Sequence, residues 1–226
     1  MKGGGASFVR RAAGFSLLEV VATMAIVALL LSWGMPAFFR AAAGARLDGA
    51  AGALESTIRF ARRHAVTAGR PTWVLFALPD DDRSEMAGRA YAVFSVETSS
   101  GASDVFKGVW LSEWRTLPEG VAFDVEAGEG LLNVFAPSSQ TWNGGFNRNR
   151  RLRVEGRTHA VLGFKPVGNG TGGYENEIYL TEGRCEAGRL IRESPVGRRV
   201  RIDAEGGVRT EVVRYGEDGK ALEVEP

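Results

Sequence analysis

The ionisable residue in the most unusual position of this 226-residue chain is Glu19, which interrupts a long apolar segment near the N-terminus. Residues 12–39 contain no other charged side chain. A carboxylate inside an apolar helix costs several kcal/mol in lipid unless it is paired, so it is a functional candidate by default. A neighbouring positive charge would offset this cost. The alternative interpretation is a side chain near the helix start that reaches the polar interface.

The two histidines and the single cysteine do not form a catalytic or metal-binding pattern. His64 and His159 lack the His-Glu-x-x-His spacing of a zinc site, and the chain has no Gly-x-Ser-x-Gly turn. We expect His64 on a helix surface and His159 in a strand or turn. Cys185 stands alone, which excludes an intrachain disulfide and a thiolate metal cluster. No cofactor, no metal site and no catalytic residue is predicted.

Two loops could bind ions, and each has a simpler interpretation. Residues 168–173 are rich in glycine but lack the Lys-Ser/Thr pair that contacts phosphate and metal, so they predict a hairpin loop. The Asp80–Asp82 triplet with Glu85 could bind a hard cation, but the spacing of an EF-hand is absent. A solvated loop is therefore favoured there.

The densest basic stretch of the chain could follow the backbone of single-stranded DNA, with Trp142 and Phe146 stacking on bases. The alternation of basic and apolar residues over 151–154 instead predicts the exposed and buried faces of one strand. Nucleic acid is therefore not an expected partner. The residues of this alternative site are Arg148, Arg150, Arg151, Arg153 and Arg157.

The composition is that of a folded protein with a nearly neutral body. Hydrophobic residues make up 44% and charged residues 24% of the chain, which excludes wholesale disorder. Of the 28 basic residues, three precede Gly14, and the remainder of the chain carries 25 basic and 27 acidic residues. This balance argues against a protein that coats nucleic acid or a membrane surface.

Hydropathy and periodicity predict one long N-terminal helix. The apolar segment exceeds the roughly 20 residues that cross a bilayer, and it is too long for the core of a secretory signal peptide. Apolar residues then recur at helical spacing from Leu47 to Ala65. Gly69, followed by Pro71, is a helix stop, so the helix is predicted to end near residue 68. Within it, the Gly34–Pro36 segment predicts a kink or a local loss of helix.

Short β-like runs follow residue 71 and predict one mostly antiparallel β domain packed on the helix, an α+β arrangement. A hairpin around Gly156 is an alternative for residues 154–161, and residues 80–85 and 183–197 are interpreted as insertions. The predicted strands are 73–78, 90–97, 105–111, 121–125, 131–135, 151–155, 160–164, 177–180, 199–203 and 209–214.

The sequence GFSLLEV at residues 14–20, behind a basic leader, resembles the prepilin peptidase site of type IV pilins and type II secretion pseudopilins. Pro36 falls at the twenty-second position after Gly14, another feature of that family. The resemblance implies cleavage after Gly14, N-methylation of Phe15, and pairing of Glu19 with the N-terminal amine of an adjacent subunit.

Three segments are similar to the minor pseudopilin branch of type II secretion protein H and the pilus protein FimT. They are ARRHA at 61–65, LPEGVAF at 117–123 and FKPVG at 164–168. The implied fold is pilin-like α+β, with a long helix and a C-terminal antiparallel β-rich domain. Its implied parts are a cleaved leader (1–14), a transmembrane or filament-core helix (15–39), an amphipathic continuation (40–69) and a globular β domain (70–226).

The resemblance implies a structural subunit of a type II secretion pseudopilus or type IV pilus, not an enzyme. The implied partners are a prepilin peptidase, other pilins, the inner-membrane assembly platform and the lipid bilayer. The implied location is the inner membrane, with a single pass and the C-terminal domain in the periplasm. Two alternatives remain open. One is a DNA-binding minor pilin for DNA uptake. The other is a membrane-anchored extracytoplasmic enzyme or binding protein, for which a pocket with convergent polar groups would be expected in the β domain.

Overall fold

The structure is a computed structural model that describes residues 16–99, 106–127, 132–135, 151–166, 175–216 and 219–223. The chain divides into two compact units, Met1–Ala42 and Ala43–Pro226. Helix α1 (Leu17–Ala68) contributes residues to both units, and strands follow it. The predicted α+β arrangement, a long helix followed by an antiparallel β-rich domain, is confirmed.

Local sequence signals account for both ends of α1. The Ser16 hydroxyl accepts a hydrogen bond from the backbone N–H of Glu19 (3.2 Å), and the Ser16 carbonyl accepts from the N–H groups of Glu19 and Val20. Ser16 is therefore the N-cap. At the other end Gly69 has φ +63°, the left-handed conformation that ends many helices, and Pro71 follows. The predicted helix stop is confirmed.

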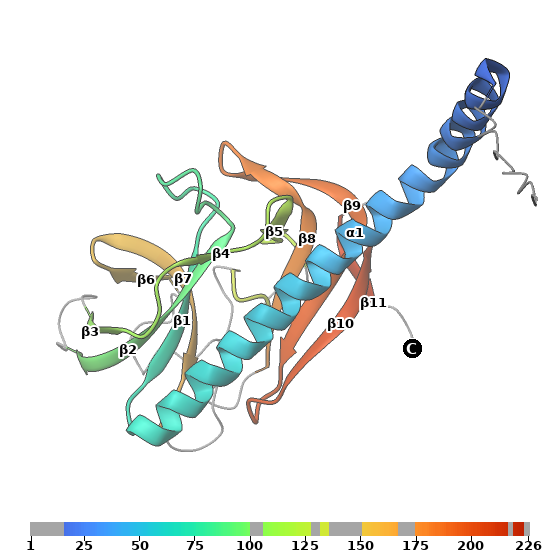
Figure 1. Cartoon of the computed structure of the whole chain (residues 1–226). Coiled ribbons are helices and arrows are strands. Elements are labelled where there is room, and N and C mark those ends of the chain that lie inside the picture. Colours follow the sequence, from blue (N-terminus) through green and yellow to red (C-terminus); the bar gives the residue numbers. More distant parts are fainter. Residues whose placement is uncertain are drawn as a thin grey trace, which may run out of the picture. The chain divides into compact units, whose positions relative to one another are not determined.

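Two antiparallel sheets make up the rest of the Ala43–Pro226 unit (Figure 1). Sheet A has the order β3-β2-β1-β7-β6, with β4 paired to β2, and sheet B has the order β11-β10-β9-β8-β5. The strands of sheet A are β1 (Thr72–Ala77), β2 (Ala90–Ser99), β3 (Phe106–Trp110), β4 (Arg115–Thr116), β6 (Arg151–Val154) and β7 (Arg157–Phe164). Those of sheet B are β5 (Val121–Phe123), β8 (Asn176–Glu186), β9 (Arg189–Ile202), β10 (Val208–Tyr215) and β11 (Ala221–Glu223).

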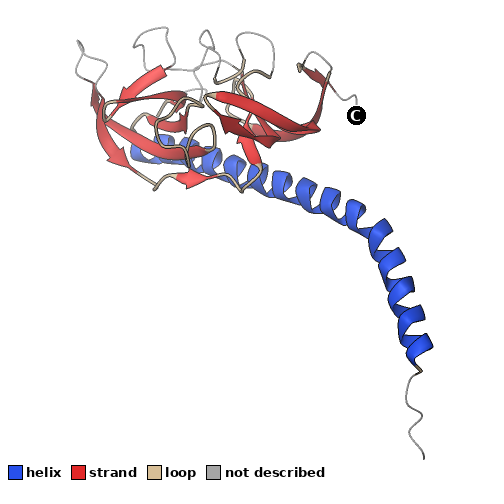
Figure 2. Cartoon of the chain, turned by 90° about the horizontal axis from the view of Figure 1, so that it is seen from above, coloured by secondary structure: helices blue, strands red, loops and turns tan. Residues whose placement is uncertain are grey.

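Residues 43–68 of α1 lie along one side of both sheets (Figures 1 and 2) and share one hydrophobic core with them. Strand β1 is buried on both faces, because Val74 and Phe76 face this core whereas Trp73 and Leu75 join a second cluster on the opposite face of sheet A. The helical positions predicted to be apolar are buried in the first core: Leu47, Ala51, Leu54, Ile58, Ala61 and Ala65.

Polar contacts at several positions along α1 also connect the helix to sheet B. The Asp48 carboxylate accepts from Arg198 (2.6 Å), and the Thr210 hydroxyl donates to Glu55 (3.0 Å). Further along, Arg59 donates to the Val208 carbonyl (2.8 Å), and Arg62 donates to the carbonyls of Glu205 (2.6 Å) and Gly206 (2.9 Å). The two arginines therefore satisfy backbone carbonyls of the β9–β10 turn and of the first residue of β10.

The hairpins differ from the sequence predictions in one important way. The hairpin around Gly156 is confirmed, since Glu155 (φ +49°) and Gly156 (φ +83°) form a two-residue turn between β6 and β7. Residues 183–197, interpreted as an insertion, extend β8 and β9 into one long hairpin that turns at Ala187 and Gly188, so this segment is regular strand rather than loop. In the described residues 132–135, Asn133 forms an isolated bridge to Glu177 rather than part of a strand.

Candidate functional site

Glu19 lies in the first turn of α1, where two structural effects favour a carboxylate. The Ser-x-x-Glu spacing from Ser16 is that of a capping box, in which the hydroxyl of the first residue binds the backbone N–H of the fourth. A negative charge also interacts favourably with the N-terminal end of the helix dipole. The Glu19 side chain is exposed and forms no ion pair with the described part of the chain. It is therefore available to a positive charge from another molecule.

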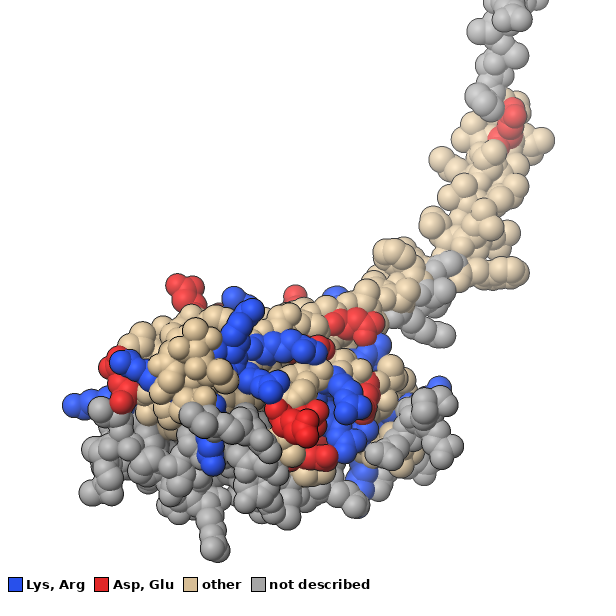
Figure 3. Space-filling view, turned by 90° about the horizontal axis from the view of Figure 1, so that it is seen from below, with Lys and Arg blue, Asp and Glu red and all other residues tan. Residues whose placement is uncertain are grey.

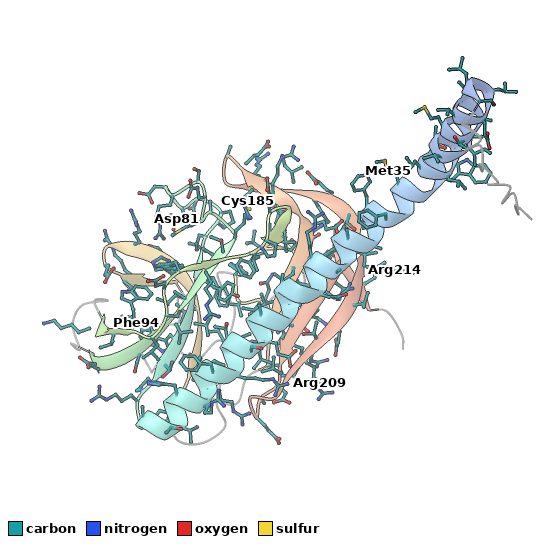
Figure 4. All side chains as sticks on the ribbon, viewed as in Figure 1. Met35, Asp81, Phe94, Cys185, Arg209 and Arg214 are labelled. Atoms are coloured by element: carbon teal, nitrogen blue, oxygen red, sulfur yellow. The ribbon has the colours of Figure 1, made fainter. Side chains whose placement is uncertain are left out.

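The large apolar side chains on both sides of Glu19 are exposed within the Met1–Ala42 unit. Leu17 is 84% and Trp33 is 83% exposed. The other members of this apolar surface are Leu18, Val20, Val21, Met24, Ile26, Val27, Leu29, Leu30, Leu31, Met35, Phe38 and Phe39. Met35 is labelled in Figure 4. A contiguous apolar surface of this kind marks an interaction site for protein or membrane.

The structure does not confirm the predicted membrane crossing, and it does not test the predicted processing site. Within the described ranges, no helix combines the length and the apolarity that a membrane crossing requires. Gly14 and Phe15 lie outside the described residues. The backbone is helical through Gly34 and Pro36, so helix is not lost there, and the kink stays a prediction.

The arginines of the alternative DNA site are only partly described. Arg148 and Arg150 lie outside the described residues, and Arg151 opens β6. Arg153 donates to the Gly156 carbonyl (3.0 Å), and Arg157 forms an ion pair with Asp82 (3.2 Å). In Figure 3 the described basic side chains on the visible face lie interleaved with acidic ones. DNA binding stays an untested alternative.

Arginine side chains pair with two carboxylates of the acidic loop, Asp80–Asp82. Both oxygens of the Asp81 carboxylate accept hydrogen bonds from Arg83 (2.9 Å each), and this pairing lowers the pKa of Asp81 to about 2. Asp82 pairs with Arg157. No group of three or more candidate metal ligands occurs among the described residues. The glycine-rich loop at 168–173 lies outside them.

Cys185 lies at the edge of a pocket of about 360 Å³ between the acidic loop and the turn of the β8–β9 hairpin. Asp81, labelled with Cys185 in Figure 4, lines the same pocket. Cys185 is a free thiol, and burial raises its pKa. A raised pKa lowers the reactive thiolate fraction, so this cysteine has the character of a packed side chain.

His159 lies on β7 and is buried, with 2% exposure. The sequence predicted a strand or a turn for this residue, and the strand is confirmed. Its Nδ1 has no hydrogen-bond partner among the described residues, and the centre of its ring lies 5.1 Å from that of Trp114. Burial lowers the pKa of His159 to about 4, so the ring is neutral at pH 7. His64 instead contacts the Thr72 hydroxyl through Nδ1 (3.1 Å) at the end of α1.

This burial predicts a pH dependence of stability. As pH falls from 7 towards 4, the unfolded chain binds a proton at His159 near pH 6.5, whereas the folded chain does so only near pH 4. The free energy of unfolding should therefore fall by about 2–3 kcal/mol over this window and level off below it. Urea unfolding of wild type and His159→Phe at pH 7, 5.5 and 4 measures it. An equal fall in the free energy of unfolding between pH 7 and pH 4 in wild type and His159→Phe would contradict the prediction.

A pocket of about 650 Å³ borders the second cluster, on the face of sheet A that points away from α1. The indole rings of Trp110 and Trp114 lie 5.6 Å apart, and the Trp110 Nε1–H donates to Glu155 (2.9 Å). The guanidinium of Arg83 lies 5.0 Å from the ring centre of Trp114. Phe94, labelled in Figure 4, packs behind Trp110 at 5.1 Å. Sequence reasoning missed this pocket, although WLSEW at 110–114 was a signal for it.

Sequence reasoning also missed a buried ion pair under sheet B. The Asp124 side chain is fully buried, and it accepts hydrogen bonds from Arg192 at 2.5 and 3.0 Å. It also accepts from the backbone N–H groups of Glu126 (3.2 Å) and Ala127 (3.0 Å). Arg192 in turn stacks on Tyr215 at 3.9 Å. The pair joins the loop after β5 to β9.

Residues 9–35 match the model of the family described as the prokaryotic N-terminal methylation motif. The matched segment contains Gly14, Phe15 and Glu19. The match covers the segment that resembles a prepilin peptidase site and confirms an N-terminal methylation motif there. The sequence matches none of the curated proteins.

Solved structures of two proteins show similarity at low sequence identity. The minor pilin FimU of Pseudomonas aeruginosa is similar in two crystal forms, at 14% and 15% identity and a TM-score of 0.39 in both cases. The similarity covers 78% of this chain and 92% or 98% of FimU. The minor pseudopilin EpsH from the type 2 secretion system of Vibrio cholerae gives 12% identity and a TM-score of 0.38, covering 74% of this chain and 96% of EpsH. The fold assignment rests on the helix and strands described above and not on these similarities.

Proposed function

We propose that this chain is a structural subunit of a type IV pilus or a type II secretion pseudopilus, matured by a prepilin peptidase that cleaves after Gly14. The observation that carries this proposal is the methylation motif over residues 9–35. A methylated N-terminus requires that a new amine be exposed, and cleavage after Gly14 exposes that of Phe15. The chain acts as the substrate of this processing and has no catalytic role of its own.

Assembly follows from the two features of the N-terminal segment. The apolar surface from Leu17 to Phe39 is covered by lipid before assembly and by the helices of neighbouring subunits afterwards. The amine of Phe15 would be costly in that apolar environment, and Glu19 of an adjacent subunit neutralises it. The pairing also fixes the axial register between subunits. Before assembly the chain crosses the inner membrane once, and the Ala43–Pro226 unit lies in the periplasm.

Local sequence patterns favour a minor subunit of the branch related to secretion protein H and FimT. The LPEGVAF segment makes a turn at Gly120 (φ +78°) that leads into β5, and its apolar residues are buried. In ARRHA, Ala61 and Ala65 face the core while Arg62 binds the β9–β10 turn. Both segments therefore have structural roles in the fold of this chain.

Mass spectrometry of the N-terminus tests the processing step. The full chain is produced with a prepilin peptidase as wild type, as Gly14→Val and as Gly5→Val. We expect the wild type and Gly5→Val to begin at Phe15 with one added methyl group. Gly14→Val should keep its leader, because the side chain added there blocks the small-residue site. An intact wild-type leader, or cleavage elsewhere, would overturn the proposal.

A further inference from the structure

We propose that the pocket beside Trp110 and Trp114 binds an organic cation, that is, an alkylammonium or guanidinium group. The site is separate from the N-terminal segment and does not depend on filament assembly. It would give a structural subunit a ligand-binding function in addition to its role in the filament.

The size and lining of the pocket fit a small ligand or one long side chain. Its volume of about 650 Å³ lies within the range of ligand sites in proteins. The two indole rings form an aromatic corner, with Trp110 and Trp114 inclined at 52°. Each ring contacts another ring of the fold, Trp110 that of Phe94 and Trp114 that of His159. The corner is therefore held in place before any ligand arrives.

Charge decides which ligand fits. Two carboxylates, Glu113 and Glu155, line the pocket, and neither forms an ion pair with the described part of the chain. Among the described lining residues the cation is Arg83, and it is already neutralised by its two hydrogen bonds to Asp81. His159 adds no positive charge, because burial lowers its pKa to about 4. Among the described residues, the lining therefore carries a negative charge that no ion pair compensates, beside two indoles.

Indole faces and carboxylates together are the groups that recognise organic cations. The ring of Trp114 already attracts a guanidinium, that of Arg83, from within the chain. The hydrogen bond from Trp110 Nε1 orients the Glu155 carboxylate at the same corner. A neutral sugar could also stack on the indoles, but it would leave the negative charge of Glu113 and Glu155 uncompensated.

Fluorine NMR of the full chain in detergent micelles, with its five tryptophans labelled as 5-fluorotryptophan, tests the proposal. Trp110→Phe and Trp114→Phe assign the two pocket signals, and the remaining tryptophans serve as internal references. The probes are choline and its neutral isostere 3,3-dimethylbutan-1-ol. A second pair is the capped peptide Gly-Lys-Gly and its norleucine analogue. We expect the cationic member of at least one pair to shift the two pocket signals saturably, in the millimolar range.

The two pairs distinguish the source of the cation, because tighter binding of choline indicates a free small molecule and tighter binding of the peptide indicates a protein side chain. Trp114→Leu should weaken binding about tenfold. The double variant Glu113→Gln/Glu155→Gln should also weaken it about tenfold, without removing core packing. Glu119→Gln, an exposed carboxylate outside the pocket, is the matched control and should leave binding unchanged.

Four results would overturn the proposal. They are equal shifts with the neutral isosteres, saturable shifts with maltose in place of the cations, unchanged affinity in the double glutamine variant, and no shift with any probe. Because the double variant changes only exposed carboxylates, its result remains interpretable even if Trp114→Leu does not fold.

Discussion

Replacing Glu19 with leucine or glutamine is expected to lower incorporation of the subunit into filaments about 100-fold. The physical reason is the unpaired amine that either variant leaves in the apolar filament core. Removing one partner of a buried ion pair costs about 3–5 kcal/mol, which corresponds to at least two orders of magnitude in an equilibrium. The measurement is the ratio of variant to tagged wild-type subunit in sheared filaments, with both produced in the same cells and quantified by mass spectrometry.

The capping geometry at Ser16 supplies the control for this experiment. Glutamine at position 19 can still complete the capping box, so Glu19→Gln removes the charge but keeps the helix start. Ser16→Ala does the reverse, since it removes the N-cap and keeps the charge. We expect Glu19→Gln to fail and Ser16→Ala to assemble, provided that both are cleaved after Gly14. The opposite order would show that Glu19 acts only as a capping residue.

Replacing Asp124 with alanine is expected to lower the free energy of unfolding by about 3–5 kcal/mol. The change removes a fully buried carboxylate and leaves Arg192 without its partner, beside the ring of Tyr215. It also leaves the backbone N–H groups of Glu126 and Ala127 without their acceptor. Urea unfolding of the full chain in detergent, followed by near-ultraviolet circular dichroism, measures the effect.

An exposed arginine of the same hairpin gives the comparison. Arg184 forms ion pairs with Glu186 and Glu193 at the surface, and its side chain is 55% exposed. Arg184→Ala should lower the free energy of unfolding far less than Asp124→Ala does, because surface ion pairs contribute little to stability. A loss of similar size in Asp124→Ala and Arg184→Ala would show that burial of the Asp124–Arg192 pair is not what makes it important.

Sequence alone was sufficient where the structure depends on neighbours along the chain. The end of α1 at Gly69 and the turn at Gly156 were predictable, because a left-handed backbone conformation favours glycine at both places. The buried face of the helix was predictable from its period. Glu19 could be singled out as a candidate functional residue, because a single charge in an apolar segment is costly unless it has a role.

The features that were missed depend on contacts between distant segments. The extension of β8 and β9 mixes charged residues with Cys185, Leu190 and Ile191 and shows no regular alternation of apolar and polar side chains, and cross-strand pairing holds it together. The aromatic pocket needs Arg83 and Glu155 to arrive from two other loops beside Trp110 and Trp114. No local pattern links these residues, so the pocket became visible only in the folded chain.

The row of polar contacts between α1 and sheet B has a mechanical consequence. Asp48, Glu55, Arg59 and Arg62 are spaced along the helix, and each is fastened to β9, β10 or the turn between them. A pulling force that acts along the axis of α1 would load these fastenings at the same time, in shear, together with the buried apolar face beside them. Rupture would then require several contacts to break at once rather than in succession. The contacts between α1 and sheet B therefore resist tension along the axis of α1 better than the same contacts would if they were loaded one after another.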